Sequence, residues 1–299
     1  MRSLNTLLPC SLLLSLCVAR LTTAQSTILL PESELILISD KFKFTEGPAA
    51  DSNGDVLFTD QPNDQIIKYS FHTGQVSTWL KPAGRSNGLY YASEKSLIAC
   101  ADDQNELWEI DTSSKEHRVI TKNFGDRRFS GPNDCWVDQD GSIYFTDPLY
   151  RRPYWTQTFA DDHPRGVYRV DKEGKVSQVA DDLQQPNGII GNTEKRLLYI
   201  ADINAGKTFR YRIGEDGTLS EKTLFCESGS DGMTIDQEGN VYLTGRGVSA
   251  YNPDGKKIMH LPVPRGWTAN VTFAGPERRH LFITAGDSVF VIKTKMQGR

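Results

Sequence analysis

Residues 133–147 read Asn-Asp-Cys-Trp-Val-Asp-Gln-Asp-Gly-Ser-Ile-Tyr-Phe-Thr-Asp, a polar turn and then two short apolar segments joined by Asp140-Gly141. Short runs of β-branched and aromatic residues between Asx-Gly turns are typical of β-strands. Two further runs of this kind, Gly166–Val170 and Lys175–Val179, follow on either side of a second Gly-containing turn. The stretch therefore predicts one four-stranded unit that begins at the turn around Asn133.

The same unit recurs along the chain. Its opening turns are centred on Glu46, Asn87, Asn133, Asn187, Asp231 and Asn270, with spacings of 41, 46, 54, 44 and 39 residues. A period in this range indicates a β-propeller, in which each repeat is one blade around a central channel. We therefore predict an all-β fold, a six-bladed β-propeller. If each turn enters the innermost strand of its blade, the polar side chains converge and offer hard oxygen ligands to a divalent cation.

The two ends of the repeat region complement one another. After Asn270 only three strands are expected, near Val271–Phe273, Leu281–Ala285 and Val289–Thr294, while an unassigned aliphatic segment, Leu35–Ile38, precedes the first turn. Pairing of this segment with the last strand would complete the sixth blade and remove an exposed sheet edge. We therefore expect the ring to be closed by the N-terminal and C-terminal strands.

The first residues resemble a targeting segment. Arg2 is followed by the apolar run Leu7–Val18 and by small residues up to Ala24, as in a secretory signal peptide. We predict a signal peptide over residues 1–24, a single propeller domain over residues 25–299, and a secreted or periplasmic location. Attachment of a lipid at Cys17 is the alternative. This apolar run is too short for a membrane span, and no other stretch approaches the required length.

Composition excludes some partners. The formal net charge is −4 with acidic and basic residues interspersed, so no basic face for nucleic acid is expected. Three cysteines follow the signal segment, and an odd number is unlike a disulfide framework. We expect Cys100, Cys135 and Cys226 to be small buried residues, with a Cys100–Cys135 disulfide bond as the alternative. We also expect the protein to be a monomer.

The third repeat carries a long insertion. Between Asp147 and Gly166 lie several aromatic residues together with Arg151, Arg152 and His163. Long loops cost little additional closure entropy and often carry function. We predict a lid that supplies walls and cations to the polar mouth of the channel.

Several segments resemble the gluconolactonase family, also called the senescence-marker-protein or regucalcin-like family. They are Glu46-Gly-Pro with Asn53–Asp60, Arg128-Phe-Ser-Gly-Pro-Asn-Asp134 with Gly141–Pro148, Gln185-Pro-Asn-Gly-Ile189, and Ser230–Asp236. The resemblance runs from about Glu46 to Thr294. One departure is the segment with Gly131, since the family's common Asn-Ser-Pro-Asn-Asp appears here as Phe129-Ser-Gly-Pro-Asn-Asp.

The resemblance implies one divalent metal with ligands at Glu46, Asn133, Asn187 and Asp231, and hydrolysis of a sugar lactone such as glucono-1,5-lactone. In some members the residue at the Asn133 position contacts substrate more than metal. Two carboxylates and two amides are hard ligands that favour Ca²⁺, with Zn²⁺, Mn²⁺ or Fe²⁺ as alternatives.

We interpret Asp231 as the general base toward water, or alternatively as a nucleophile. Asn133, Arg128 and Asn87 are the candidate substrate contacts, with Arg151 and Arg152 as further candidates. For the arginines a role as surface charge is the alternative.

Two rival functions remain. The first is hydrolysis of another ester or a phosphoester at the same site. The second is a non-catalytic propeller that binds a carbohydrate or protein and uses calcium structurally. Propellers host many functions, so the fold alone does not choose among them.

Overall fold

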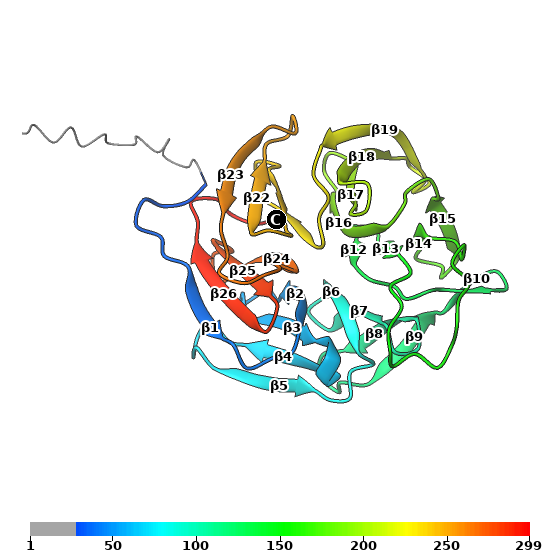
Figure 1. Cartoon of the computed structure of the whole chain (residues 1–299), viewed down its shortest axis with the longest axis horizontal. Coiled ribbons are helices and arrows are strands. Elements are labelled where there is room, and N and C mark those ends of the chain that lie inside the picture. The colour runs from blue at the N-terminus through cyan, green and yellow to red at the C-terminus, as the bar shows by residue number, and fades with distance from the viewer. Residues whose placement is uncertain (1–27) are drawn as a thin grey trace, which may run out of the picture.

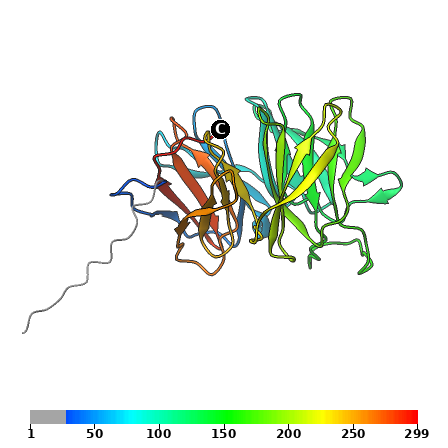
Figure 2. The ribbon, with the colours of Figure 1, turned by 90° about the horizontal axis from the view of Figure 1, so that it is seen from above.

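The computed structural model describes residues 28–299, which form six four-stranded sheets and one two-stranded hairpin. The six sheets are arranged as blades around a common axis (Figure 1), and the view turned by 90° shows the blades side by side (Figure 2). The predicted six-bladed propeller is confirmed. Within residues 28–299 the helical structure is a single 3-10 turn, η1 (Gln61–Asn63), and no helix there has the length and hydropathy to span a membrane.

The blades are consecutive antiparallel meanders. The first blade contains β2 (Thr45–Ala50), β3 (Val56–Asp60), β4 (Gln65–Tyr69) and β5 (Val76–Leu80). The second contains β6 (Ser86–Ser93), β7 (Ser96–Ala101), β8 (Glu106–Asp111) and β9 (His117–Thr121), and the hairpin β10 (Asn123–Phe124) and β11 (Arg127–Arg128) follows it. The third contains β12 (Cys135–Val137), β13 (Ile143–Asp147), β14 (Gly166–Val170) and β15 (Val176–Ala180).

The remaining blades repeat this order. The fourth contains β16 (Pro186–Asn192), β17 (Leu197–Asp202), β18 (Lys207–Ile213) and β19 (Leu219–Cys226). The fifth contains β20 (Met233–Ile235), β21 (Val241–Leu243), β22 (Val248–Tyr251) and β23 (Lys257–Leu261). The sixth contains β24 (Asn270–Ala274), β25 (His280–Ala285), β26 (Ser288–Lys293) and the N-terminal strand β1 (Ile36–Ser39).

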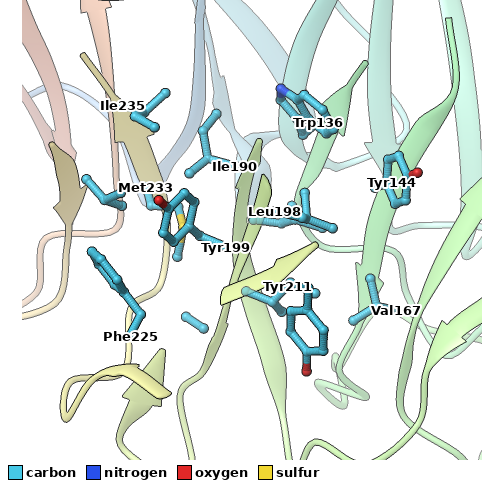
Figure 3. Close-up of a cluster of buried hydrophobic side chains, with 14 of the residues drawn as sticks. Trp136, Tyr144, Val167, Ile190, Leu198, Tyr199, Tyr211, Phe225, Met233 and Ile235 are labelled. Atoms are coloured by element: carbon cyan, nitrogen blue, oxygen red, sulfur yellow. The ribbon is translucent and has the colours of Figure 1, made fainter. Parts of the chain in front are cut away.

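The apolar strands are buried on both faces because each blade is covered by its two neighbours. In β13, Tyr144 belongs to a core shared with the fourth and fifth blades, whereas Phe145 belongs to a core shared with the second blade. Successive side chains of a strand point to opposite faces, so this sequence of consecutive apolar residues fills both interfaces. Figure 3 shows the first of these cores, with Trp136 and Tyr144 near Leu198.

Ring closure follows the prediction from the ends of the sequence. β1 pairs antiparallel with β26, with Ile36 opposite Val291 and Leu37 opposite Phe290. Ile38 packs against the core between the first and sixth blades, and the ring of Phe42 meets that of Phe58 edge-on at 5.2 Å between centroids. The sixth blade is therefore completed by residues from both ends of the described chain.

The predicted signal peptide, residues 1–24, and its Cys17 lie outside the described residues. The expected burial of the other three cysteines is confirmed. Cys100, Cys135 and Cys226 are buried and unpaired, and the alternative Cys100–Cys135 bond is absent.

Candidate functional site

The polar turns coincide with irregularities in the innermost strands. The register of these strands shifts between Glu46 and Ala49 in the first blade, and between Pro186 and Ile189 in the fourth. In the third and fifth blades the ladder begins only after Asn133 and Asp231. Bulges of this kind redirect side chains and are common beside functional sites. Here they release polar side chains from the regular ladder.

Glycines after two of the polar residues allow neighbouring turns to approach closely. A Cβ atom at Gly47, which has a φ of +42°, would lie 2.0 Å from the carbonyl oxygen of Asn87. A Cβ at Gly188 would lie 2.8 Å from the carbonyl oxygen of Asp231. Only glycine fits such contacts, so the X-Gly turns set the spacing between adjacent polar residues around the channel.

A cavity of about 420 Å³ lies where these turns meet. Its lining residues are Phe44, Glu46, Asn87, Asn133, Tyr150, Arg152, Gln185, Ile203, Asn204, Asp231 and Trp267. Glu46, Asn87 and Asn133 are almost fully buried. Asn187 adjoins this set through its contacts with Tyr150 and Asp231.

Asp231 is the centre of a hydrogen-bond network. Its Oδ1 accepts a hydrogen bond from Nδ2 of Asn187 at 2.7 Å, and its Oδ2 accepts one from Nε1 of Trp267 at 2.5 Å. Nδ2 of Asn187 also donates to the hydroxyl oxygen of Tyr150 at 2.9 Å. The Asn187 amide therefore directs its nitrogen toward these acceptors, and its Oδ1 is left buried without a hydrogen-bond partner.

The carboxylates are held in an environment that disfavours their charged forms. Burial, followed by the nearby Asp231 carboxylate, raises the pKa of Glu46 well above its ordinary value. Burial raises the pKa of Asp231 to about 6, although the hydrogen bonds from Trp267 and Asn187 oppose this rise. Two carboxyl groups that repel one another in a buried pocket are stabilised by a bound cation.

The residues present fit a hard divalent cation. Buried oxygens without partners are unusual in folded proteins, and the free Oδ1 of Asn187 belongs to a residue whose amide nitrogen contacts Asp231 in the cavity wall. Within residues 28–299 no cluster of three or more His, Cys, Asp or Glu side chains forms a candidate metal site. The predicted ligand set, Glu46, Asn133, Asn187 and Asp231, contains only two side chains of these types, so this criterion does not apply to it.

Asp134 lies next to the site and was assigned no role from the sequence. It lines a second, narrower cavity of about 160 Å³ along the inner strands, together with Asn270. Its Oδ1 accepts a hydrogen bond from the backbone nitrogen of Cys135 at 2.9 Å, and burial raises its pKa to about 8. Asn133 and Asp134 therefore face two adjoining cavities.

Two predicted contacts lie elsewhere. Arg128 does not line the cavity, because its Nη2 donates to the carbonyl oxygen of Gln104. Arg151 binds the carbonyl oxygen of Phe159 and pairs with the exposed Asp161 at 2.8 Å. Of the three candidate arginines, the structure brings only Arg152 to the cavity.

The long loop after β13 forms one wall of the cavity, through Tyr150 and Arg152. Its centre is fastened to the second blade, where Nε1 of Trp155 donates to the carbonyl oxygen of Asp102 at 2.8 Å. His163 binds the carbonyl oxygen of Arg128 and does not line the cavity. The first third of the loop thus has the position expected of a lid.

Several lining residues were not identified from the sequence, namely Phe44, Tyr150, Gln185, Ile203, Asn204 and Trp267. Phe44 and Gln185 lie two residues before polar turn residues, and Trp267 lies three residues before Asn270. Their position relative to the polar turns is therefore the sequence signal that could have identified these three residues.

Comparisons with known proteins agree with this geometry. A family model described as SMP-30/Gluconolactonase/LRE-like region matches residues 44–287. A gluconolactonase of Zymomonas mobilis is 25% identical over 291 residues, covering 88% of this chain and 82% of the relative. A diisopropyl-fluorophosphatase of Loligo vulgaris is 25% identical over 287 residues, covering 87% and 91%. The solved structure of a calcium-binding protein, regucalcin, from Agrobacterium tumefaciens has a TM-score of 0.75 at 21% identity, covering 89% of this chain and 95% of that one.

Proposed function

The chain belongs to the SMP-30/gluconolactonase/LRE-like family and is a hydrolase of carboxylic esters, and from this premise we propose that it opens the ring of a sugar lactone such as glucono-1,5-lactone. Relatives named for lactone hydrolysis support this proposal. The observation that carries it for this chain is the buried, unpartnered Oδ1 of Asn187 beside Asp231 and Glu46.

We propose that Glu46, Asn133, Asn187 and Asp231 hold one divalent cation, Ca²⁺ in preference to Zn²⁺, Mn²⁺ or Fe²⁺. When bound, the cation would supply Lewis-acid polarisation of the lactone carbonyl. Tyr150 accepts a hydrogen bond from Nδ2 of Asn187, as Asp231 does. These two bonds fix the orientation of the Asn187 amide, so that its Oδ1 points away from Tyr150 and Asp231.

The chemical step requires a base for water. Asp231 lies in the wall of the cavity, and its carboxylate can accept a proton from a water molecule within hydrogen-bond reach. In the proposed reaction Asp231 takes a proton from water as the water oxygen bonds to the carbonyl carbon. The bond from that carbon to the ring oxygen then breaks, and the ring oxygen receives the proton, which yields the open-chain hydroxy acid.

The alternative assignment of Asp231 is as a nucleophile. Both of its carboxylate oxygens accept hydrogen bonds, from Asn187 and from Trp267. These bonds fix the carboxylate and lower its basicity and its nucleophilicity alike, so they do not choose between the two roles.

A second candidate function is hydrolysis at phosphorus, of a phosphoester or a phosphorofluoridate, favoured by the likeness to the diisopropyl-fluorophosphatase of Loligo vulgaris. The assay that separates the candidates is acid release from glucono-1,5-lactone and from diisopropyl fluorophosphate, each with the uncatalysed blank subtracted. A higher kcat/KM for the lactone supports the proposal. Activity on the phosphorus compound alone would replace it, and activity on neither would favour the non-catalytic propeller.

Export remains a proposal that rests on residues 1–24. Expression of the full chain followed by mass spectrometry of the protein outside the cell tests it, with an N-terminus near Gln25 as the expected result.

A further inference from the structure

Among the described residues 28–299, Arg152 is the only positively charged one that lines the 420 Å³ cavity. Its Nε donates to Oδ2 of Asp102 at 3.2 Å, and its guanidinium lies 5.3 Å from the centre of the Tyr150 ring. Among residues 28–299, neither terminal nitrogen of Arg152 has a hydrogen-bond partner. One edge of the guanidinium is thus fixed, while the fork of two terminal nitrogens remains available.

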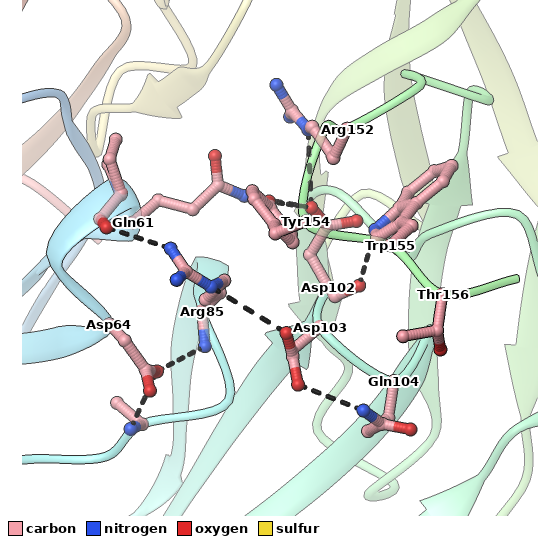
Figure 4. Close-up of polar contacts among 12 residues, drawn as sticks. Gln61, Asp64, Arg85, Asp102, Asp103, Gln104, Arg152, Tyr154, Trp155 and Thr156 are labelled. Atoms are coloured by element: carbon pink, nitrogen blue, oxygen red, sulfur yellow. Dashed lines mark hydrogen bonds and ion pairs between the residues drawn. The ribbon is translucent and has the colours of Figure 1, made fainter.

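The fixed edge is held by an unusually well-anchored carboxylate. Asp102 is 3% exposed, and its Oδ2 also accepts hydrogen bonds from the Tyr154 hydroxyl and from Nε2 of Gln61. Figure 4 shows Arg152 reaching Asp102 through one nitrogen while its other nitrogens point away from this cluster. Three side chains therefore donate to Oδ2 of Asp102. Its contact with Arg152 holds the guanidinium in place and leaves it able to bind a second anion.

The local backbone is built around this anchor. Gly131 has a φ of +122°, and a Cβ there would lie 2.5 Å from Oδ1 of Asp102 and 2.9 Å from the Trp155 ring. Gly131 is the residue by which the segment before Asn133 departs from the common family pattern. The departure thus makes room for the contact between Asp102 and the loop that carries Arg152.

The other polar groups of the cavity cannot do the same chemistry. Glu46 and Asp231 repel an anion, and Asn87, Gln185 and Asn204 are neutral amides suited to hydroxyl groups. A fixed, planar guanidinium matches a carboxylate or phosphate through two parallel hydrogen bonds. Arg152 is therefore the lining residue suited to distinguish substrates by charge.

Building on the proposed lactonase function, we infer that Arg152 is a specificity-determining residue and that the preferred substrates are lactones bearing a carboxylate or another anionic group remote from the ring carbonyl. Asp102 acts as its positioning residue. Neutral sugar lactones remain substrates, but they leave the guanidinium fork solvated.

The matched substrates for a test are D-glucono-1,4-lactone and D-glucaro-1,4-lactone. They share one ring and differ only in carrying a hydroxymethyl group or a carboxylate at the far carbon. The measured quantity is the ratio of kcat/KM for the glucaro compound to kcat/KM for the glucono compound, followed by acid release at about pH 7 with blanks subtracted.

The wild-type ratio is expected to be about ten or more. Arg152→Gln should lower it by about tenfold to a hundredfold, as expected for loss of hydrogen bonds between two charged groups. The matched control is Arg151→Gln, which removes the adjacent arginine outside the cavity and should leave the ratio unchanged. Melting curves establish that each variant is folded.

An unchanged ratio in folded Arg152→Gln, or a wild-type ratio of one or less, overturns the inference while leaving lactonase activity in place. Hydrolysis of neither 1,4-lactone overturns this inference, and glucono-1,5-lactone assayed beside them then decides the proposed function. If Arg152→Gln does not fold, Arg152→Lys decides, because lysine keeps the charge but not the fork. Its ratio should fall below the wild-type value, and a wild-type ratio in that variant contradicts the assignment.

Discussion

Asp231→Asn separates proton transfer from metal binding at the centre of the site. The substitution keeps the size of the side chain and one oxygen but removes the basic carboxylate. Both carboxylate oxygens now face donors, Nδ2 of Asn187 at 2.7 Å and Nε1 of Trp267 at 2.5 Å. An asparagine has one acceptor oxygen, so one of these two donors must lose its partner.

The structure sets the size of that secondary loss. One hydrogen bond left unmade at a buried site costs about 1–3 kcal/mol, which corresponds to about 5-fold to 150-fold in a rate or binding constant. Removal of a general base typically costs about 10²–10⁴ in rate. If Asp231 is the base, metal-saturated Asp231→Asn should therefore lose about two to four orders of magnitude in kcat.

The matched control is Trp267→Phe, which removes the hydrogen bond to Oδ2 and leaves the carboxylate in place. It should lose no more than the amount expected for one hydrogen bond. Both variants are assayed near pH 6–7 on the best lactone, across a series of metal concentrations, because aldonolactones hydrolyse unaided at alkaline pH. If Asp231→Asn reaches the wild-type rate when metal is saturating, Asp231 is a ligand alone and the base assignment is refuted.

Three further predictions concern metal, closure and pH. Glu46→Gln should weaken Ca²⁺ binding sharply without unfolding the domain, as measured by calorimetric titration of the chelated protein, and an unaltered affinity would remove Glu46 from the ligand set. Deletion of residues 1–45 removes β1 and the buried Ile28 and exposes an edge of β26. It should lower the melting temperature severely relative to a deletion of residues 1–24. Equal melting temperatures of the two deletions would contradict closure by β1. Burial raises the pKa of Asp134 to about 8 and of Asp231 to about 6, so these groups hold protons in the folded, chelated protein that the unfolded chain releases, and the stability that they contribute should fall as the pH rises from about 4 through about 6–8. Thermal melts at several pH values check this, and a chelated protein that becomes more stable over that range would reverse the assignment.

The architecture was predictable from the sequence because its determinants are local and repeated. Six polar turns at similar spacing gave the blades, and the unassigned aliphatic segment at Leu35–Ile38 gave the closing strand. Neither inference required knowing how distant side chains meet. The shift of register at Glu46 was not predicted, since a bulge inside a strand leaves no clear mark in the hydrophobic pattern.

The candidate site was only partly predictable. The polar turn residues around the channel follow from the repeat, but the contacts of the long loop depend on how it folds back over the mouth. Arg151 and Arg152 are adjacent in sequence, yet one pairs with exposed Asp161 and the other reaches buried Asp102. Likewise Trp267 meets Asp231 across 36 residues of sequence, a contact that no local pattern specifies.

The most direct test of the central claim is a titration of activity with metal. The protein is chelated, Ca²⁺ is returned in measured fractions of one equivalent, and acid release from glucono-1,5-lactone is followed after subtraction of the blank. One site formed by Glu46, Asn133, Asn187 and Asp231 predicts almost no activity in the chelated protein and a rise that reaches its plateau near one equivalent. Full activity in the chelated protein, or none at any concentration of Ca²⁺, Zn²⁺, Mn²⁺ or Fe²⁺, would contradict the account.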